Sequence, residues 1–401
     1  MIYYARKIIW LIFLSAFVAG CSGLKFGSSS NLLVERAAVK TPKQITLLLP
    51  FGGNFASSSQ AIHNGFLAAY YYARQKHPDI NIKVVDTSRG DVGEFYKQAV
   101  ALGADVIVGP LTKDEVEAVI ASGPLTVPTI ALNTADNYVD NVVPNLYQFG
   151  LVPQDDAIQA AAKILGDRHQ RVAIIAPDNA WGERIIKVFA KRYTASGGTI
   201  VASLGYEVGD SNLASQICNF VAADPNKLCV RQKHRSKQDK IIPDVLNRRQ
   251  DIDAIFLVAN QNDARQIIPL LKFYYAGDLP LYATADIFNG SSRMDVNRDL
   301  GGAMFCDMPW VLADQSLLPA DLQAIHAQIV AAWPESFSNY SKLYALGVDA
   351  FNLAINLGGF LQAPQAGMKA ATGTLYLDSY NHIYRELEWA KIQVDGTIDV
   401  R

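Results

Sequence analysis

The 401-residue sequence has little cysteine, little histidine and almost no excess of charge of either sign. It holds four cysteines and six histidines, and its formal net charge is −2. This near-neutral balance argues against a nucleic-acid partner, because proteins that bind the phosphate backbone usually carry a marked basic excess. Hydrophobic residues make up 50% of the chain. That share excludes intrinsic disorder, since disordered chains combine low hydrophobicity with high net charge.

The sequence also lacks the short motifs that mark common enzyme active sites. It contains no G-x-S-x-G, H-E-x-x-H, P-loop or G-x-G-x-x-G pattern and no Cys-x-x-Cys pair. The histidines are scattered, and each is better explained as a surface or internally bonded residue than as a base or ligand: His63, His77, His169, His234, His326 and His382. We therefore predict a protein that is not an enzyme and that holds no metal and no cofactor.

Long apolar runs are absent except for one at the N-terminus. Arg6 and Lys7 precede Ile8–Ala19, about 12 residues long, which suits a signal-peptide core and falls short of the roughly 20 residues that span a bilayer. Small residues followed by Cys21 resemble a bacterial lipobox. We predict that residues 1–20 are removed and that Cys21 carries lipid.

The residues after Cys21 are expected to tether the protein to a membrane. Residues 21–43 include a Gly-Ser-Ser-Ser segment with the composition of a flexible linker. Ser22, rather than Asp, follows the lipidated position, which is typical of sorting to the outer membrane. The predicted location is therefore the periplasmic face of the outer membrane, with membrane contact made through the N-terminal lipid.

The remaining cysteines fit an exported protein. Cys218 and Cys229 would close a short loop, and an oxidising periplasm permits such a bridge. We predict that they form a disulfide. Cys306 lies in an apolar, strand-like run and is interpreted as a small buried hydrophobe.

From residue 45 onward, short apolar runs alternate with longer amphipathic ones. Ile45–Leu49, Val106–Val108 and Thr129–Leu132 are continuous apolar runs, each followed by a helical pattern or a turn. Such strands are typical of a parallel sheet covered by helices on both faces. The alternation restarts after residue 150. The predicted fold is α/β with two lobes, each a doubly wound, mostly parallel sheet with helices on both faces.

Polar residues gather where the predicted strands end. Ligands of open α/β sheets bind beyond the carboxyl ends of the strands, so these residues are candidate contacts for a small ligand: Ser57, Ser58, Ser59, Asp86, Leu111, Thr112, Asn133, Asn179 and Asn260. Most of them are also residue types that cap helices. For each residue alone, capping is the simpler interpretation. Taken together, these nine residues form a strand-end ring for which a ligand role stays open.

One segment stands out by its charge. Residues 227–249 hold eight lysines and arginines against Asp239 and Asp244. This basic stretch is either a solvated loop or a surface for an acidic partner. Its candidate partner-binding residues are Arg231, Lys233, Arg235, Lys237, Lys240, Arg248 and Arg249.

Several motifs carry a family resemblance. Ile45–Pro50 with Gly65–Ala69, and Val106–Leu111, resemble the first βα unit and third strand of type I periplasmic binding proteins. A more specific set is similar to the C-terminal domain of the LpoA family of penicillin-binding protein activators: Arg248–Ala254, Phe273–Pro280, Tyr282–Thr284, Asp307–Trp310, Leu343–Ala350, Gly373–Leu375 and Glu388–Ala390. The resemblance extends over residues 44–401.

The resemblance implies a fold and a role. It implies two lobes joined by three crossings, with 44–150 plus 282–363 in lobe 1 and 151–281 plus 364–401 in lobe 2. It also implies a regulator that docks on a class A penicillin-binding protein, a peptidoglycan synthase, and activates its peptide cross-linking. The alternative is a periplasmic solute-binding lipoprotein that takes an amino-acid-like or cell-wall-derived ligand between its lobes. A purely structural envelope protein is a third interpretation.

One departure from the family concerns the tether. Longer members carry a helical-repeat domain ahead of the binding-protein-like domain, where this sequence places residues 21–43. A tether of about 20 residues spans at most roughly 70 Å when fully extended. We therefore expect its length to limit how far the domain reaches from the membrane.

Overall fold

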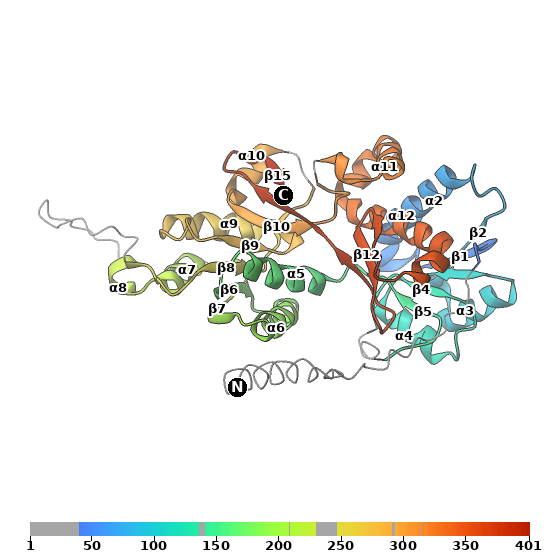
Figure 1. The fold of residues 1–401 in the computed structure, drawn as a ribbon, viewed down its shortest axis with the longest axis horizontal. Helices are drawn as coiled ribbons and strands as arrows, with labels where there is room; N and C mark the ends of the chain where they lie inside the picture. The colour runs from blue at the N-terminus through green and yellow to red at the C-terminus, as the bar shows by residue number, and fades with distance from the viewer. Residues whose placement is uncertain (1–39, 136–140, 208, 230–246, 291–292, 313) are drawn as a thin grey trace, which may run out of the picture. The chain divides into compact units, whose positions relative to one another are not determined.

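The structure is a computed structural model that describes residues 40–135, 141–207, 209–229, 247–290, 293–312 and 314–401. The expected alternation of buried strands and helices is confirmed, and the described strands form three sheets (Figure 1). Lipidation at Cys21, the signal peptide and most of the tether lie outside the described residues.

Lobe 1 is built on five parallel strands in the order β2-β1-β3-β4-β5. These strands are β1 (Gln44–Leu49), β2 (Asn81–Asp86), β3 (Val106–Val108), β4 (Thr129–Ala131) and β5 (Leu146–Gln148). The helices between them are α2 (Ala56–Ala73), α3 (Val92–Ala101) and α4 (Lys113–Ala121). The inner strands are buried along their length, whereas β2 is partly exposed because it lies at the sheet edge.

Lobe 2 is built on seven strands in the order β15-β14-β10-β9-β8-β6-β7. They are β6 (Arg171–Pro177), β7 (Thr199–Tyr206), β8 (Ala254–Leu257), β9 (Leu281–Ala283), β10 (Ala303–Asp307), β14 (Glu388–Ile392) and β15 (Ile398–Val400). Strands β6 to β10 are parallel, and the last two are antiparallel. The main helices are α5 (Pro153–Gly166), α6 (Ala180–Ala195), α7 (Leu213–Val221), α8 (Pro225–Leu228), α9 (Gln261–Phe273) and α10 (Met294–Asn297).

The rest of the chain returns to lobe 1. It comprises α11 (Ala320–Ala332), α12 (Pro334–Gln362) and a small antiparallel sheet of β11 (Met368–Ala370), β12 (Gly373–Leu377) and β13 (Ile383–Glu386). The buried carboxylate of Asp349 accepts hydrogen bonds from the backbone N–H groups of Ala371 at 2.8 Å and Thr372 at 2.7 Å. Burial raises the pKa of Asp349 to about 6. This carboxylate therefore fixes the β11–β12 turn to α12.

The expected lobe boundaries at 282 and 364 are wrong. β9 and β10 add to the second sheet beside β8, so the chain returns to lobe 1 only after Asp307. β12 and β13 contribute Leu375 and Ile383 to the lobe 1 core, and the chain reaches lobe 2 again near Glu388. The physical reason is that consecutive strands usually add beside one another in the same sheet. The local sequence does not show which sheet a new apolar strand joins.

Helix α12 is long and apolar enough to span a membrane, and it is the single such helix in the described part of the chain. Of the apolar part of this helix, 67% is buried inside the protein. The helix packs on α2, where Phe66 and Phe351 meet edge to face with ring centroids 5.3 Å apart. Its hydropathy is thus that of a core helix of lobe 1 (Figure 1).

Candidate functional site

The carboxyl edge of the first sheet holds the candidate residues Asp86 and Thr112 in capping roles. Asp86 accepts hydrogen bonds from the N–H of Phe51 at 2.9 Å, from the hydroxyl of Ser88 at 2.6 Å and from Arg89 at 2.8 Å. The Ser88 hydroxyl is the main cause that lowers the pKa of Asp86 to about 2. Thr112 and Glu115 form a reciprocal capping box that starts α4. Both polar groups therefore stabilise local structure.

Asn133 is the candidate that joins two strand ends of this sheet. Its amide donates to the carbonyl of Leu111 at 3.0 Å, and its side-chain oxygen accepts from the N–H of Thr134 at 2.9 Å. Leu111 itself is buried in the lobe 1 core. The structure thus brings Leu111 and Asn133 into contact, as expected of neighbouring strand ends.

Three serines follow β1 in the first turns of α2. Ser57 is exposed, Ser58 is half-buried and Ser59 is fully buried. The hydroxyl of Ser59 has no hydrogen-bond partner among the described residues. Among these three serines, Ser59 is therefore the one with a buried hydroxyl that has no partner among the described residues.

The two candidates in lobe 2 are helix caps. Asn179 accepts from the backbone of Trp181 at 3.0 Å and Gly182 at 2.9 Å at the start of α6. Asn260 accepts from the N–H of Asp263 at 3.1 Å and donates to its carboxylate at 2.8 Å at the start of α9. β6 and β8 are neighbours, so both caps lie at the same edge of the second sheet.

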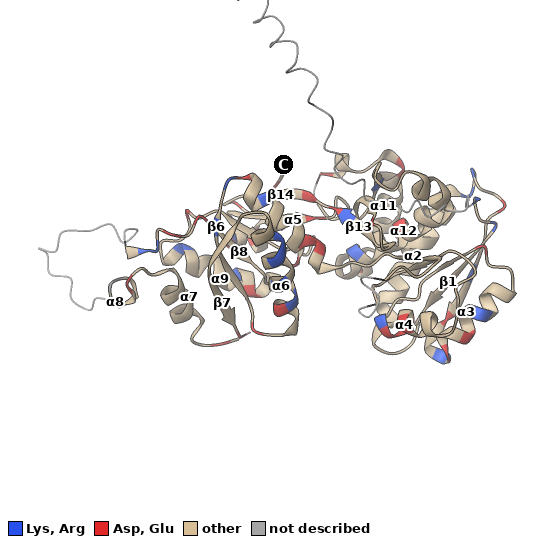
Figure 2. Ribbon diagram, turned by 60° about the horizontal axis from the view of Figure 1, so that its bottom comes forward, with Lys and Arg blue, Asp and Glu red and all other residues tan. Residues whose placement is uncertain are grey.

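Of the basic stretch, the structure describes residues 227–229 and 247–249. Arg248 pairs with Asp278 at 3.1 Å, and Arg249 pairs with Asp251 at 2.6 Å. Arg231, Lys233, Arg235, Lys237 and Lys240 lie outside the described residues. Elsewhere on the described chain, acidic and basic residues are mixed over the helices of both lobes (Figure 2).

The segment before the basic stretch is held by a disulfide. Cys218 and Cys229 are bonded, with an S–S distance of 2.03 Å, and Cys306 is a buried free thiol. The bridge ties α7 to the residue that follows α8. It therefore holds the start of the basic stretch, up to Cys229, against α7.

A network of buried charges links the lobes, and it was not among the predicted sites. Lys342 of α12 pairs with Asp307, the last residue of β10, at 2.9 Å. Its ammonium also donates to the carbonyl of Ala285 at 3.2 Å, and the N–H of Ala285 donates to Asp156 of α5 at 3.0 Å. Asp307 and Asp156 are 0% and 5% exposed. One ammonium therefore faces two buried carboxyl groups.

The network shifts the pKa values of its members. Burial raises the pKa of Asp156 to about 7, against the opposing charge of Arg385. Burial also raises the pKa of Asp307, and Lys342 opposes it. For Lys342, burial lowers the pKa, but the carboxylates, Asp307 first, outweigh it and the net direction is upward. Lys342 is therefore charged at neutral pH, while Asp156 titrates close to neutrality.

A second contact lies at the start of α5. The buried guanidinium of Arg385 in β13 approaches Asp155 at 3.5 Å. Gln159 donates to the carbonyl of Arg385 at 3.1 Å and accepts from the N–H of Leu387 at 2.8 Å. The helix that opens lobe 2 is thereby bonded to the strand by which the chain leaves lobe 1.

Sequence reasoning missed this network because its members look ordinary one at a time. Asp155 and Asp156 are typical first-turn acids, which the helix dipole favours. The available signal was Asp307, a charged residue that closes the buried apolar strand β10. Its partner Lys342 lies far along the chain, and only the fold places it alongside.

A hollow of about 1120 Å³ borders α5 and the β12–β13 region. Tyr376 and Tyr384 stack on one side with ring centroids 5.4 Å apart. Lys163 pairs with Asp167 at 2.7 Å, and the lining also holds further acids, the basic Arg385 and apolar side chains such as Ile158. Because Lys163 is already paired with Asp167, we interpret the hollow as a contact surface and not as a reactive centre.

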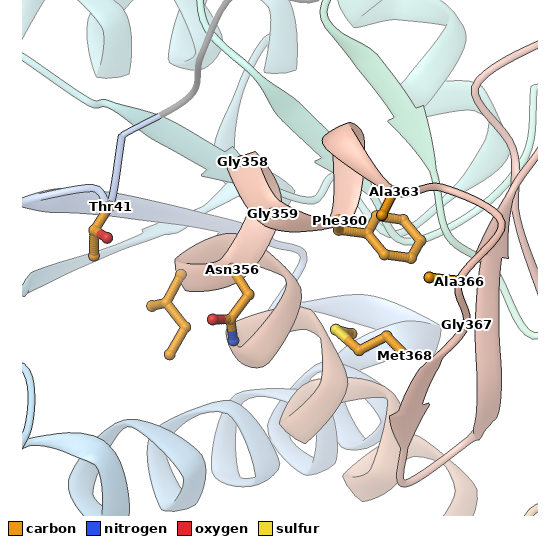
Figure 3. Close-up of a pocket in the computed structure, with 10 residues that line it drawn as sticks. Thr41, Asn356, Gly358, Gly359, Phe360, Ala363, Ala366, Gly367 and Met368 are labelled. Atoms are coloured by element: carbon orange, nitrogen blue, oxygen red, sulfur yellow. The ribbon is translucent and has the colours of Figure 1, made fainter.

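A smaller hollow of about 480 Å³ lies at the end of α12 (Figure 3). It is lined by Thr41, Ile355, Asn356, Gly358, Gly359, Phe360, Ala363, Ala366, Gly367 and Met368. Its lining contains no titratable side chain, so acid–base chemistry has no residue to act through here. Among the described residues, no cluster of three or more His, Cys, Asp or Glu side chains is placed to hold a metal ion.

A family model described as "LppC putative lipoprotein" matches residues 34–395. The chain belongs to this family. The match covers both lobes of the LppC-family chain and begins after Cys21. The resemblance drawn from the sequence is thus confirmed, and lipidation at Cys21 remains a prediction.

A curated relative also supports the resemblance to the LpoA family. The LppC-family chain is 26% identical over 356 residues to "Penicillin-binding protein activator LpoA" of Vibrio antiquarius (strain Ex25), covering 87% of this chain and 57% of that protein. The chain therefore spans just over half the length of this relative.

Two solved structures share the fold. The LpoA C-domain from Haemophilus influenzae, titled a regulator of PBP1A, is 23% identical with a TM-score of 0.70, covering 89% of this chain and 99% of that domain. A structure from Chromobacterium violaceum titled "a putative branched-chain amino acid ABC transporter" is 24% identical with a TM-score of 0.62, covering 87% and 99%. The predicted two-lobed α/β fold is confirmed by both.

Proposed function

We propose that this LppC-family protein is a non-enzymatic activator of a class A penicillin-binding protein and acts by protein contact. The observation that carries the proposal is the similarity, over 87% of the chain, to a relative named as such an activator. The local geometry supports a binding role, because the polar groups of Asp86, Thr112, Asn133, Asn179 and Asn260 cap helices or join loops instead of forming a reactive set.

The proposal includes a location. Lipid on Cys21 would hold the protein at the periplasmic face of the outer membrane, and residues 21–43 would tether the two lobes to it. The LppC family is described as lipoproteins, which supports the anchor. The partner enzyme would then be met by a surface of the two lobes.

The direct test is reconstitution. The mature protein, purified without its signal peptide, is mixed with a class A penicillin-binding protein from the same cell, and peptide cross-linking of lipid-linked substrate is followed. We expect binding and a severalfold rise in the fraction of cross-linked peptides. A partner that neither binds the protein nor changes its cross-linking rate would overturn the proposal.

The basic stretch provides a prediction about the contact surface. Neutralising Arg231, Lys233, Arg235, Lys237 and Lys240 with glutamine should weaken partner binding by about tenfold or more, since each rim charge contributes up to about 1 kcal/mol. The binding of the unchanged protein should also weaken as salt rises, because exposed charges are screened. Surface plasmon resonance at low and physiological salt measures both effects.

The matched control removes the same number of charges elsewhere. Lys76, Arg184, Lys187, Lys191 and Arg192 are all exposed, on α6 or after α2. Their replacement by glutamine should leave the affinity within about threefold, since charges outside an interface contribute little. Equal losses in both variants would identify the stretch as an ordinary solvated loop.

Solute binding remains a second candidate, and one observation favours it. The hydroxyl of Ser59, near the start of α2, is buried with no hydrogen-bond partner among the described residues. An amino-acid ligand there would raise the melting temperature of the protein, and Ser59→Ala would reduce that rise. A thermal-shift series with amino acids tests this directly, and no stabilisation by any of them would remove the candidate.

A further inference from the structure

A third cavity, of about 460 Å³, lies among elements that the chain brings together from far apart. Its wall includes Phe288 after β9, Trp310 and Gln315 after β10, and His326 of α11. Phe337 and Ser341, from the first turns of α12, complete it. Its volume falls within the roughly 300–1,000 Å³ typical of small-molecule sites. No residue of the predicted strand-end ring lines it.

Three buried polar atoms in this wall have no hydrogen-bond partner among the described residues: Trp310 Nε1, Gln315 Oε1 and Ser341 Oγ. Trp310 is only 1% exposed. Buried polar groups are normally bonded, because desolvation without a partner costs free energy. Single unpartnered atoms occur elsewhere, as at Thr46 and Tyr96, but here a donor, an acceptor and a hydroxyl line one cavity.

The same wall is aromatic. The rings of Trp310 and His326 lie 4.6 Å apart, and those of His326 and Phe337 lie 5.1 Å apart, both edge to face. Burial lowers the pKa of His326, so its imidazole is neutral at neutral pH. Aromatic faces of this kind contact flat apolar surfaces of a ligand.

The cavity lining carries no Asp, Glu, Lys or Arg among its described residues. A free amino acid would bring a carboxylate and an ammonium, and each would be left without a counter-charge in this wall. A neutral ligand with hydroxyl groups and an apolar face meets both the orphan polar atoms and the aromatic rings.

We propose that this cavity binds a neutral sugar residue. The sugar ring packs against the aromatic wall, and its hydroxyl or acetamido groups bond to Trp310 Nε1, Gln315 Oε1 and Ser341 Oγ. The site is independent of the proposed activation of a penicillin-binding protein, and it is separate from the strand-end ring. The sugar could be free or part of a glycan chain, since both present the same chemistry.

Isothermal titration calorimetry of the mature protein tests the site. The probes are N-acetylglucosamine, its β-1,4-linked tetramer and glucose, with leucine as the charged comparison. We expect saturable binding of at least one sugar and none of leucine. Tighter binding of the tetramer would assign a glycan chain, and equal or weaker binding would assign a free sugar; either result upholds the site.

Matched variants localise the binding. Ser341→Ala and Gln315→Met should each weaken sugar binding by about three- to tenfold, the value of one lost hydrogen bond. Thr46→Val removes another buried hydroxyl that has no hydrogen-bond partner among the described residues and does not line the cavity, so it should leave the affinity unchanged. Absence of sugar binding up to about tens of millimolar, where weak sites still register, would overturn the proposal. So would binding that Thr46→Val weakens and Ser341→Ala leaves intact.

Discussion

Replacing Gly347 by valine lowers the free energy of unfolding by about 3 kcal/mol or more, because overpacking of a tight contact forces backbone shifts. Gly347 lies on α12 where this helix crosses α2, and a Cβ there would meet the Ile62 carbonyl oxygen at 2.0 Å and the Phe66 nitrogen at 2.8 Å. On the facing helix, a Cβ at Gly65 would meet the Tyr344 carbonyl oxygen at 2.2 Å. The two backbones touch through both glycines.

Circular dichroism during urea and thermal unfolding measures the effect. Gly359→Ala is the matched control, since Gly359 lies on the same helix and an added Cβ there meets nothing within 4 Å. It should leave the stability unchanged or raise it by up to about 1 kcal/mol, the difference in helix propensity between the two residues. A Gly347→Val protein as stable as Gly359→Ala would show that the helices do not cross as described.

Lys342→Met is expected to cost about 3–5 kcal/mol of stability at pH 7, because it leaves the buried carboxylate of Asp307 without its cation. Lys342 pairs with Asp307 at 2.9 Å, and Asp307 is fully buried. The control Lys163→Met breaks the pair with Asp167, in which both side chains are about 30% exposed. The Lys342 side chain is 29% exposed, so the two pairs differ in the burial of the carboxylate. That exposed pair should contribute less than about 1 kcal/mol. Equal losses in the two variants would contradict the role assigned to the buried pair.

The pH dependence of stability follows from Asp156. Its folded-state pKa is raised to about 7 by burial, above its value in the unfolded chain. The folded state therefore binds the proton more tightly, so this contribution to stability is complete at acid pH and is lost as pH rises through 7. Asp156→Asn should flatten the decline in stability between about pH 4 and 7, the interval between the pKa of the unfolded chain and that of the folded protein.

The same measurement separates the two acids. In Lys342→Met, Asp307 loses the cation that opposes its raised pKa, so the decline in stability with rising pH should become steeper. Urea unfolding at intervals across this range gives the slope for each protein. A wild-type stability that rises with pH over the whole interval would contradict a raised pKa at Asp156.

Local sequence patterns were sufficient for the strands and most caps. The run of β1 is apolar along its length because both faces of a central parallel strand are covered, and that pattern is readable without a structure. Thr112 and Asn179 cap helices as their residue types favour. Cys218 and Cys229 are bonded as their short separation suggested. Each of these features depends on residues close together in the chain.

The division of the chain between lobes was not readable in this way. β9 and β12 were assigned to the wrong lobes, since an apolar strand has the same composition in either sheet. The partner of a strand is decided by which sheet edge is open when the chain folds. Whether the strand-end residues bind a ligand stays a prediction.

The alternation of apolar runs determined the α/β class from the sequence alone, and short motifs such as Arg248–Ala254 and Phe273–Pro280 carried the family resemblance. The tertiary structure decided what joins the lobes. Asp156, Asp307 and Lys342 lie on three separate elements. Only the fold buries them, pairs Lys342 with Asp307 and links Asp156 to Lys342 through the backbone of Ala285. The same holds for Trp310, Gln315 and Ser341, whose unpartnered atoms become a candidate site only when the fold encloses one cavity with them.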